Sequence, residues 1–156
     1  MMRQSFHDCA ALTQEISGCR LCAQRFAATA TRHAPRPVVW FRPSARILIA
    51  GQAPGLRVHD SGRPYTDASG DRLRQWLGVS EDVFYDRDQI AIVPMAFCFP
   101  GYNAKKADLP PPPECAIKYS TKHAYRMRLI RRHSPGLWLQ IKRKMLIKLK
   151  LRLSQR

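Results

Sequence analysis

Acidic residues are absent from the last 41 positions of this chain. Residues 116–156 hold 13 Lys and Arg and no Asp or Glu, a net charge of +13, whereas residues 1–115 hold 14 Lys and Arg and 11 Asp and Glu, a net charge of +3. Two interpretations stay open: a nucleic-acid-binding arm whose cations neutralise phosphates, or a foreign reading frame that replaced an original carboxyl-terminal sequence. We therefore predict a folded domain over 1–116 and a basic tail over 117–156 that is disordered or non-native.

Long apolar runs are missing as well. No run approaches the roughly 18 residues that a membrane span needs, and the amino end lacks the apolar core of a secretion signal. A chain of 156 residues is long enough for one domain with a real core. These features predict a monomeric, cytoplasmic protein with no membrane partner.

Cysteine occurs only five times, and in a reducing compartment these thiols are metal ligands or buried side chains rather than disulfides. Cys19 and Cys22 form a C-x2-C pair, and a long loop separates Cys98 from Cys115. A C-x2-C turn points two thiolates at one centre, which suits zinc or an iron–sulfur cluster. Buried thiols packed as small hydrophobes are the alternative. Cys9 fits no pair and is interpreted as structural.

The segment from Arg46 to Leu77 organises the rest of the chain. It begins with a strand pattern at 46–50 whose residues 47–50 are continuously apolar, typical of a strand buried on both faces. A small-residue turn, a polar loop and a helix over about 69–77 follow, and Gly78 ends the helix. Strand, glycine turn, polar loop and helix in this order favour an α/β fold with a site at the carboxyl end of the strand.

Other elements are predicted around this segment. The apolar pattern after Asp8 predicts a short helix that ends at Gly18, and the run at 90–93 predicts a second buried strand. Residues 81–88 are interpreted as an acidic connection. The alternation at 147–153 has the period of two that is typical of a strand.

The turn and the polar loop hold the residues that favour chemistry. The glycines of the turn Gly51, Gln52, Ala53, Pro54 and Gly55 let a ligand approach the backbone, although a plain turn is the alternative. In the loop, Tyr65 can stack on a flat base, Asp60 and Asp67 can orient water or steady a cation, and Arg63 can meet a nucleic-acid phosphate. The alternative is a solvated loop in which Asp67 caps the following helix.

Three segments together resemble the iron–sulfur branch of the uracil-DNA glycosylase superfamily. They are Cys19-x2-Cys22, the GQAPG turn with SGRPYTDASG after it, and CFPGYN at 98–103 with Cys115 after it. The resemblance covers residues 19–115 and agrees in order and spacing. It implies a three-layer α/β/α sandwich around a short parallel sheet. Because residues 117–156 show no counterpart of the family's carboxyl end, we expect this sheet to be incomplete at its carboxyl-terminal side.

The resemblance also implies a cofactor and a mechanism. It implies a [4Fe-4S] cluster on Cys19, Cys22, Cys98 and Cys115, with zinc as the alternative. The partner would be DNA that contains uracil or another deaminated base, swung out of the helix into a pocket. The backbone of the turn at 51–55 and Asn103 would line that pocket, and Tyr65 would stand where the family has a stacking Phe.

This sequence departs from the family pattern at several positions. Gln52 replaces the Glu of GEAPG, Val58 and His59 replace an acidic pair, and Pro94 falls where the branch has an Asn that reads uracil. Asp67 is therefore our first candidate for the group that orients water, and Asp60 the second. The sequence predicts a glycosylase-like hydrolase, inactive in this form if the carboxyl end is not native, or else a non-catalytic nucleic-acid-binding protein.

Overall fold

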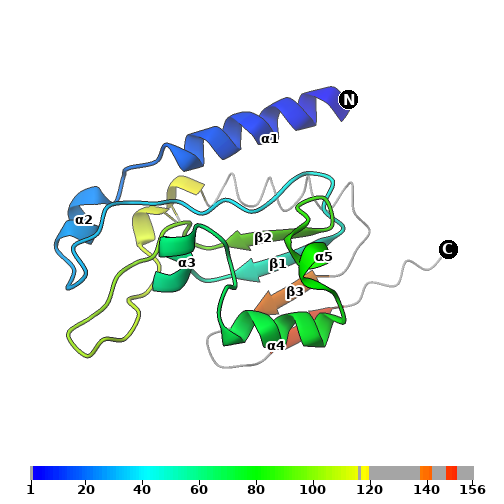
Figure 1. Cartoon of the computed structure of the whole chain (residues 1–156). Coiled ribbons are helices and arrows are strands. Elements are labelled where there is room, and N and C mark those ends of the chain that lie inside the picture. The colour runs from blue at the N-terminus through cyan, green and yellow to red at the C-terminus, as the bar shows by residue number, and fades with distance from the viewer. Residues whose placement is uncertain (1, 116, 120–137, 142–146, 151–156) are drawn as a thin grey trace.

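The computed structural model describes residues 2–115, 117–119, 138–141 and 147–150. The helices labelled in Figure 1 come first along the chain, with strand β1 among them, and the other strands follow. In order they are α1 (Met2–Ser17), α2 (Ala23–Ala27), β1 (Ile47–Gly51), α3 (Leu56–Ser61), α4 (Ala68–Leu77), α5 (Glu81–Tyr85), β2 (Ile90–Pro94), β3 (Trp138–Ile141) and β4 (Ile147–Lys150). Within these residues no helix is both long and apolar enough to cross a bilayer.

The four strands form one sheet in the order β2-β1-β3-β4. Strand β1 runs parallel to both of its neighbours, and β4 runs antiparallel to β3 at the edge. In the β1–β2 pair, Ile47 lies opposite Ile90 and Gly51 lies opposite Pro94. The carboxyl ends of the two strands therefore meet at the same edge of the sheet, where ligand sites of parallel sheets form.

Helices cover both faces of this sheet. Successive side chains of a strand point to opposite sides, and in β1 and β2 the side chains on both sides are apolar. Leu48, Ala91 and Val93 pack with Ile16 of α1 in one core cluster. Ile49, Ile90 and Ile92 pack on the other face with Leu73 of α4 and Phe84 of α5. The predicted α/β/α layering is confirmed, and burial on both faces explains why β1 and β2 are continuously apolar.

Local signals account for several element boundaries. Helix α4 begins after Asp67, whose side chain accepts a hydrogen bond from the Gly70 amide, and ends at Gly78, which has a left-handed φ of 65°. The predicted helix at about 69–77 is thus confirmed. Residues 81–88 differ from the prediction: Ser80 caps α5, so that the first five of them are helical rather than a connection.

The basic segment contributes two strands to the sheet. Strand β3 pairs with β1 through Leu48, Ile49 and Ala50, opposite Trp138, Leu139 and Gln140. The strand predicted from the alternation at 147–153 is confirmed over Ile147–Lys150, where β4 pairs with β3. Neighbours on both sides of β1 therefore come from distant parts of the sequence.

Candidate active site

A pocket of about 250 Å³ opens at the carboxyl ends of β1 and β2. The turn after β1 and Pro94 at the end of β2 line it. The Gly51 and Gln52 carbonyls accept hydrogen bonds from the amides of Met95 (3.0 Å) and Ala96 (2.9 Å), which joins the two strand ends. The pocket therefore rests on backbone that is fixed by the sheet and by the segment after it.

Most of the residues that the sequence nominated lie in the wall of this pocket. They are Gly51, Gln52, Ala53, Pro54, Gly55, Tyr65 and Asp67. Asp60, Arg63 and Asn103 are not among its lining residues. The remaining described walls are mostly apolar, with Val38, Trp40, Val58, Pro64 and Ile92 joined by Ser69 and Asp108.

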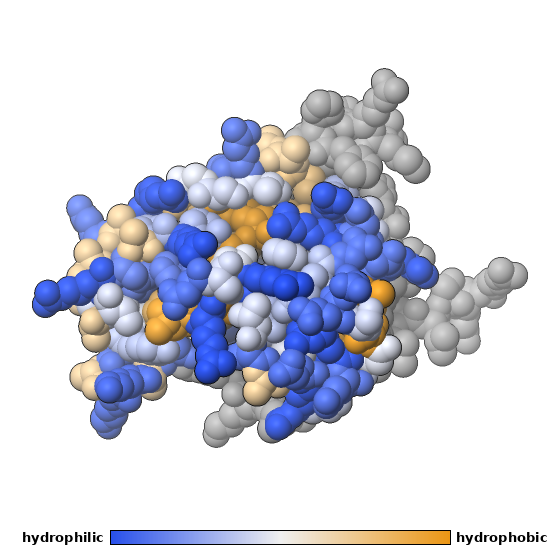
Figure 2. Space-filling view, viewed as in Figure 1, coloured by the Kyte–Doolittle hydropathy of each residue, from blue (hydrophilic) through white to orange (hydrophobic). Residues whose placement is uncertain are grey.

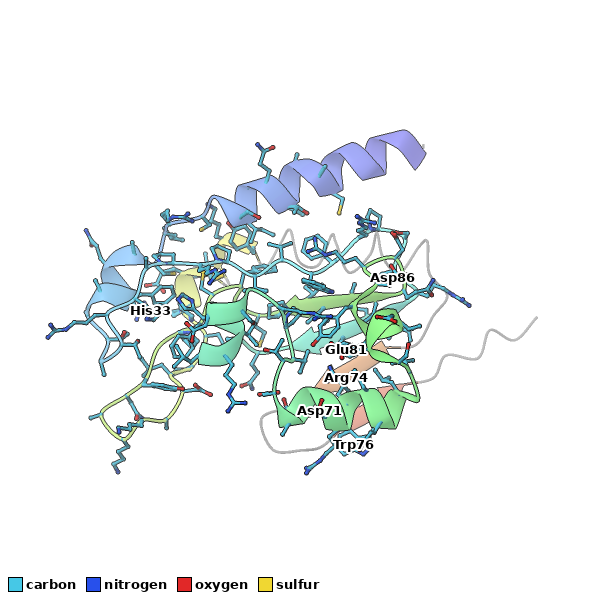
Figure 3. All side chains as sticks on the ribbon, viewed as in Figure 1. His33, Asp71, Arg74, Trp76, Glu81 and Asp86 are labelled. Carbon is cyan, nitrogen blue, oxygen red and sulfur yellow. The ribbon has the colours of Figure 1, made fainter. Side chains whose placement is uncertain are left out.

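Tyr65 is held in an unusual backbone conformation, with a φ of 55°. Its carbonyl accepts hydrogen bonds from the Tyr85 hydroxyl (3.0 Å) and the Arg74 guanidinium (3.3 Å). Arg74 lies on α4, and its ion pair with Asp71 on the same helix keeps the guanidinium in place (Figure 3). A left-handed φ is unfavourable for a non-glycine residue and persists only where neighbouring groups hold it.

The side chain of Tyr65 reaches across the pocket toward β1. Its ring meets the Phe84 ring edge to face, with centroids 6.0 Å apart, and its hydroxyl lies 3.5 Å from where a Cβ on Gly51 would stand. Burial raises the pKa of this hydroxyl to about 12, and the nearby Asp67 carboxylate adds to the rise. Tyr65 therefore presents a neutral aromatic face and a hydroxyl at the strand end.

Helix α4 approaches Tyr65 so closely that its first turn needs glycine. A Cβ on Gly70 would lie 1.9 Å from the Tyr65 carbonyl oxygen. At the same turn, Oδ1 of Asp67 accepts hydrogen bonds from the Gly70 amide (3.2 Å) and the Ser69 hydroxyl. Asp67 is thus both the helix cap that the sequence allowed and a wall of the pocket.

Asp60 and Arg63 have other surroundings. Asp60 is exposed on α3, and its carbonyl accepts a hydrogen bond of 2.7 Å from the Arg36 guanidinium. Arg63 stacks on the Tyr85 ring at 3.6 Å and pairs with Glu81 at 3.3 Å. The face of the molecule that bears α3, α4 and α5 is mainly hydrophilic, with a few apolar areas between the polar side chains (Figure 2).

Asn103 organises its own loop. Its Oδ1 accepts hydrogen bonds from the amides of Lys105 (2.9 Å) and Ala107 (3.0 Å), and the residue is exposed. The pocket residue from this loop is instead Asp108. The sequence did not point to Asp108, because no motif includes it. Its place at the pocket depends on how the loop between Cys98 and Cys115 folds back on itself.

The four cysteines nominated as ligands line a second, smaller pocket on the α1 and α2 side of the molecule. Cys19, Cys22, Cys98 and Cys115 surround a space of about 20 Å³ with apolar walls such as Phe26 and Tyr119. In the described part of the chain, no three His, Cys, Asp or Glu side chains converge as the ligands of a single metal ion. Cys9 is not part of this group.

The environment of these thiols favours the protonated form. Burial raises the pKa of Cys22 to about 11 and that of Cys98 to about 12, and the neighbouring cysteines add to both shifts. Burial also raises the pKa of Cys115. Such thiols ionise readily only beside a cation, because its charge offsets burial and mutual repulsion.

Comparison with known proteins connects this geometry to a family. Residues 38–150 match the family description "Uracil DNA glycosylase superfamily", a range that contains strands β1 to β4 and the loop with Asp108. The chain belongs to this superfamily. The range also passes the boundary predicted at residue 116, so the superfamily match includes most of the basic segment.

Within the uracil-DNA glycosylase superfamily, one curated relative is a Type-4 uracil-DNA glycosylase from Sulfurisphaera tokodaii. It is 36% identical to this chain over 61 residues, which are 39% of this chain and 27% of the relative. The match thus spans about a quarter of the relative's length.

Proposed function

We propose that this superfamily member hydrolyses the bond between deoxyribose and uracil, or another deaminated base, in DNA. The observation that supports it is the meeting of an aromatic ring and a carboxylate, Tyr65 and Asp67, in one pocket at the end of β1. A base swung out of the DNA helix can enter such a pocket and stack on an aromatic side chain. The superfamily match supports the reaction class, and the pocket is the site that we propose for it.

In the proposed reaction, the C1′–N bond breaks and its electron pair leaves with the base. A water oxygen then bonds to C1′, the water gives up a proton, and the departing base gains one. Positive charge builds on the sugar during this step, so a carboxylate beside it lowers the barrier. We assign Asp67 to this position, because it lines the pocket whereas Asp60 does not.

The experiment is excision of uracil from a labelled single-stranded oligonucleotide, followed by cleavage of abasic sites with alkali. Asp67→Asn retains a side-chain oxygen for the helix cap but removes the charge, and we expect about a hundredfold slower excision. Asp60→Asn is the matched control and should leave the rate unchanged. An unmodified protein that leaves uracil in place would reject the proposed function.

We also propose that Cys19, Cys22, Cys98 and Cys115 hold a [4Fe-4S] cluster. The donor set fits, since four thiols from three parts of the chain line one apolar pocket. Each iron of such a cluster takes one thiolate, so the sulfurs stand farther apart than around a single ion. The space between the thiols is only about 20 Å³. The residues that line it would therefore have to move apart when a cluster binds. The cluster would brace the loop that leads from Cys98 to Cys115.

Iron content and colour test the cluster. Protein purified without oxygen should be brown and contain about four irons per chain, and Cys98→Ser should be colourless. Cys9→Ser is the matched control, because Cys9 lies outside the thiol pocket, and should stay brown. Colourless protein that contains one zinc would replace this proposal with the zinc alternative.

A second candidate function is supported by charge. Residues 116–156 carry a net charge of +13, enough to bind nucleic acid without any chemistry. A gel shift of the oligonucleotide without cleavage at uracil would favour this non-catalytic function over the hydrolase.

A further inference from the structure

The hydroxyl of Tyr65 has no hydrogen-bond partner among the described residues, whereas the rest of this residue is engaged. Its carbonyl accepts hydrogen bonds from Tyr85 and Arg74, and its ring meets the Phe84 ring edge to face. The nearby Asp67 carboxylate acts on the hydroxyl through its charge. Polar groups inside a folded protein usually have a partner. This hydroxyl is therefore available to a ligand.

Tyr65 places its hydroxyl beside Gly51, at the end of β1. The hydroxyl oxygen lies 3.5 Å from where a Cβ on Gly51 would stand, and apart from the chain next to Gly51 no other described atom lies within 4 Å of that point. Both residues line the pocket. Unlike Nε1 of Trp40, which is buried without a partner, the Tyr65 hydroxyl is not closed off from solvent. The missing side chain at Gly51 thus leaves the hydroxyl open to the pocket.

Few side chains in the described wall of the pocket can donate a hydrogen bond to a ligand. The Ser69 hydroxyl is engaged at the start of α4, and Nε1 of Trp40 is closed off from solvent. Pro94 has no N–H at all. Among the described lining residues this leaves the side chains of Gln52 and Tyr65. Of the two, Tyr65 has printed neighbours that hold its ring and its backbone in place.

A phenol hydroxyl at this position suits the departing base of the proposed reaction. Burial raises the pKa of Tyr65 to about 12, so the group carries its proton at neutral pH and can donate a hydrogen bond. When the C1′–N bond breaks, its electron pair moves onto the base, and negative charge gathers on the carbonyl oxygens. A hydrogen bond to such an oxygen strengthens as the charge grows. The contact is therefore worth more in the transition state than in the bound substrate.

We propose that the Tyr65 hydroxyl donates a hydrogen bond to a carbonyl oxygen of the swung-out base and stabilises the base as it leaves. The inference rests on the proposed function for the nature of the ligand. Tyr65 keeps its proton and forms no covalent bond: the C1′–N electron pair leaves with the base, and the water oxygen bonds to C1′. The ring supplies a stacking face, and the hydroxyl supplies the polar contact.

The first test measures binding, with single-stranded oligonucleotides that differ at one position. One carries 2′-fluoro-2′-deoxyuridine, whose fluorine slows cleavage of the C1′–N bond, and the other carries a tetrahydrofuran ring without a base. Fluorescence anisotropy gives the affinity of the full chain for each. We expect the unmodified protein to prefer the uracil-containing strand, and Tyr65→Phe, which retains the ring, to lose about fivefold of that preference.

The second test measures excision with enzyme in excess over DNA. We expect Tyr65→Phe to remove uracil about thirtyfold more slowly than the unmodified chain, because a hydrogen bond to a charged oxygen is lost. The defect should be smaller for 5-fluorouracil, since its fluorine withdraws electrons and already stabilises the departing base. A purely structural role of the hydroxyl would slow the removal of both bases equally.

A matched control removes a hydroxyl elsewhere. Tyr102 does not line the pocket, so Tyr102→Phe should keep the full binding preference and rate. Tyr65→Phe loses no hydrogen bond within the described residues, and its circular dichroism spectrum should therefore match that of the unmodified chain. An unmodified chain without a preference for the base, a Tyr65→Phe protein with the full preference, or equal slowing for the two bases would overturn the proposal.

The two tests together separate this inference from the proposed function. If the unmodified chain excises uracil and Tyr65→Phe matches it in rate and in binding preference, the role of the hydroxyl fails alone. If no protein excises uracil, the hydrolase function fails, and the binding preference still decides whether the Tyr65 hydroxyl contacts the base.

Discussion

Tyr65 has its side chain positioned by a backbone conformation that is energetically unfavourable for a non-glycine residue. A left-handed conformation costs a non-glycine residue about 1–2 kcal/mol. Two side-chain donors on the Tyr65 carbonyl, from Tyr85 and Arg74, offset that cost, and Gly70 makes room for the same carbonyl. The aromatic wall of the pocket thus depends on three residues that do not touch a ligand.

Substitution of Gly70 tests this arrangement. Gly70→Ala brings a methyl group against the Tyr65 carbonyl, so either α4 or Tyr65 must move. We expect a loss of about 1–3 kcal/mol in the free energy of unfolding, measured by urea denaturation. Gly55→Ala is the matched control, because no atom lies within 4 Å of its added Cβ, and should cost less than about 1 kcal/mol. Equal losses in the two variants would contradict the close contact.

Titration of Tyr65 provides a second prediction at this scale. Its pKa lies at about 12 in the folded protein and near 10.0 when exposed, so the unfolded chain loses this proton first. The contribution of Tyr65 to stability is therefore complete below pH 10 and falls as pH rises toward 12, by about 1–3 kcal/mol. Comparison of Tyr65→Phe with the unmodified chain, by tyrosinate absorbance and by unfolding at alkaline pH, measures it. Ionisation of Tyr65 near pH 10 in the folded protein would contradict it.

Asp67, at the start of helix α4, has two roles. Asp67 begins the helix and also lines the pocket, so an effect of its substitution on activity can come from a frayed helix or from lost charge. Asparagine caps a helix about as well as aspartate, whereas alanine does not. The two roles can therefore be separated.

We expect Asp67→Ala to lower the free energy of unfolding by about 1 kcal/mol, and Asp67→Asn to change it by only a few tenths of a kcal/mol. Uracil excision should be slow in both. Thermal unfolding followed by circular dichroism, together with the excision assay, measures the pair. Full activity in Asp67→Asn would assign Asp67 to the helix alone.

The elements differ in how well the sequence predicts them. Strands β1 and β2 are predictable from their apolar runs, and α4 from its pattern and Gly78. Helices α3 and α5 are too short to show helical periodicity, and Ser80 before α5 was the available signal. At the site, Tyr65 and Asp67 could be nominated because they lie in the polar loop between the turn after β1 and the start of α4. Asp108 was not, because only the fold of the loop after Cys98 brings it to the pocket.

At the scale of the whole molecule, the net charge of +16 bears on the proposed binding of DNA. Most of that charge belongs to residues 116–156, and the near-neutral remainder holds the acidic pocket. On the proposed function, attraction of the phosphate backbone and attraction of a sugar cation come from different parts of the sequence. Long-range attraction is screened by salt, whereas a contact within the pocket is less so.

Salt dependence tests this division. Replacing Lys142, Arg143 and Lys144, which lie outside the described residues, by Gln should reduce the slope of log affinity against log salt by up to about 0.9 per lost phosphate contact on duplex DNA. Replacing Arg20, Arg32 and Arg46 by Gln removes the same charge from the first 115 residues and should change the slope less. Affinities from fluorescence anisotropy over a salt series measure both, and equal changes would contradict the division.

The position of β1 has a consequence for how the chain is made. Its two neighbours are β2, which ends at Pro94, and β3, which begins at Trp138. During synthesis, β1 can pair with β2 early, but its other edge waits until at least 47 more residues have left the ribosome. Nascent chains halted in that interval expose an apolar edge strand that invites pairing with other chains. Pulse-labelled chains stalled before Trp138 should therefore recruit chaperones, and release them once Ile141 has emerged.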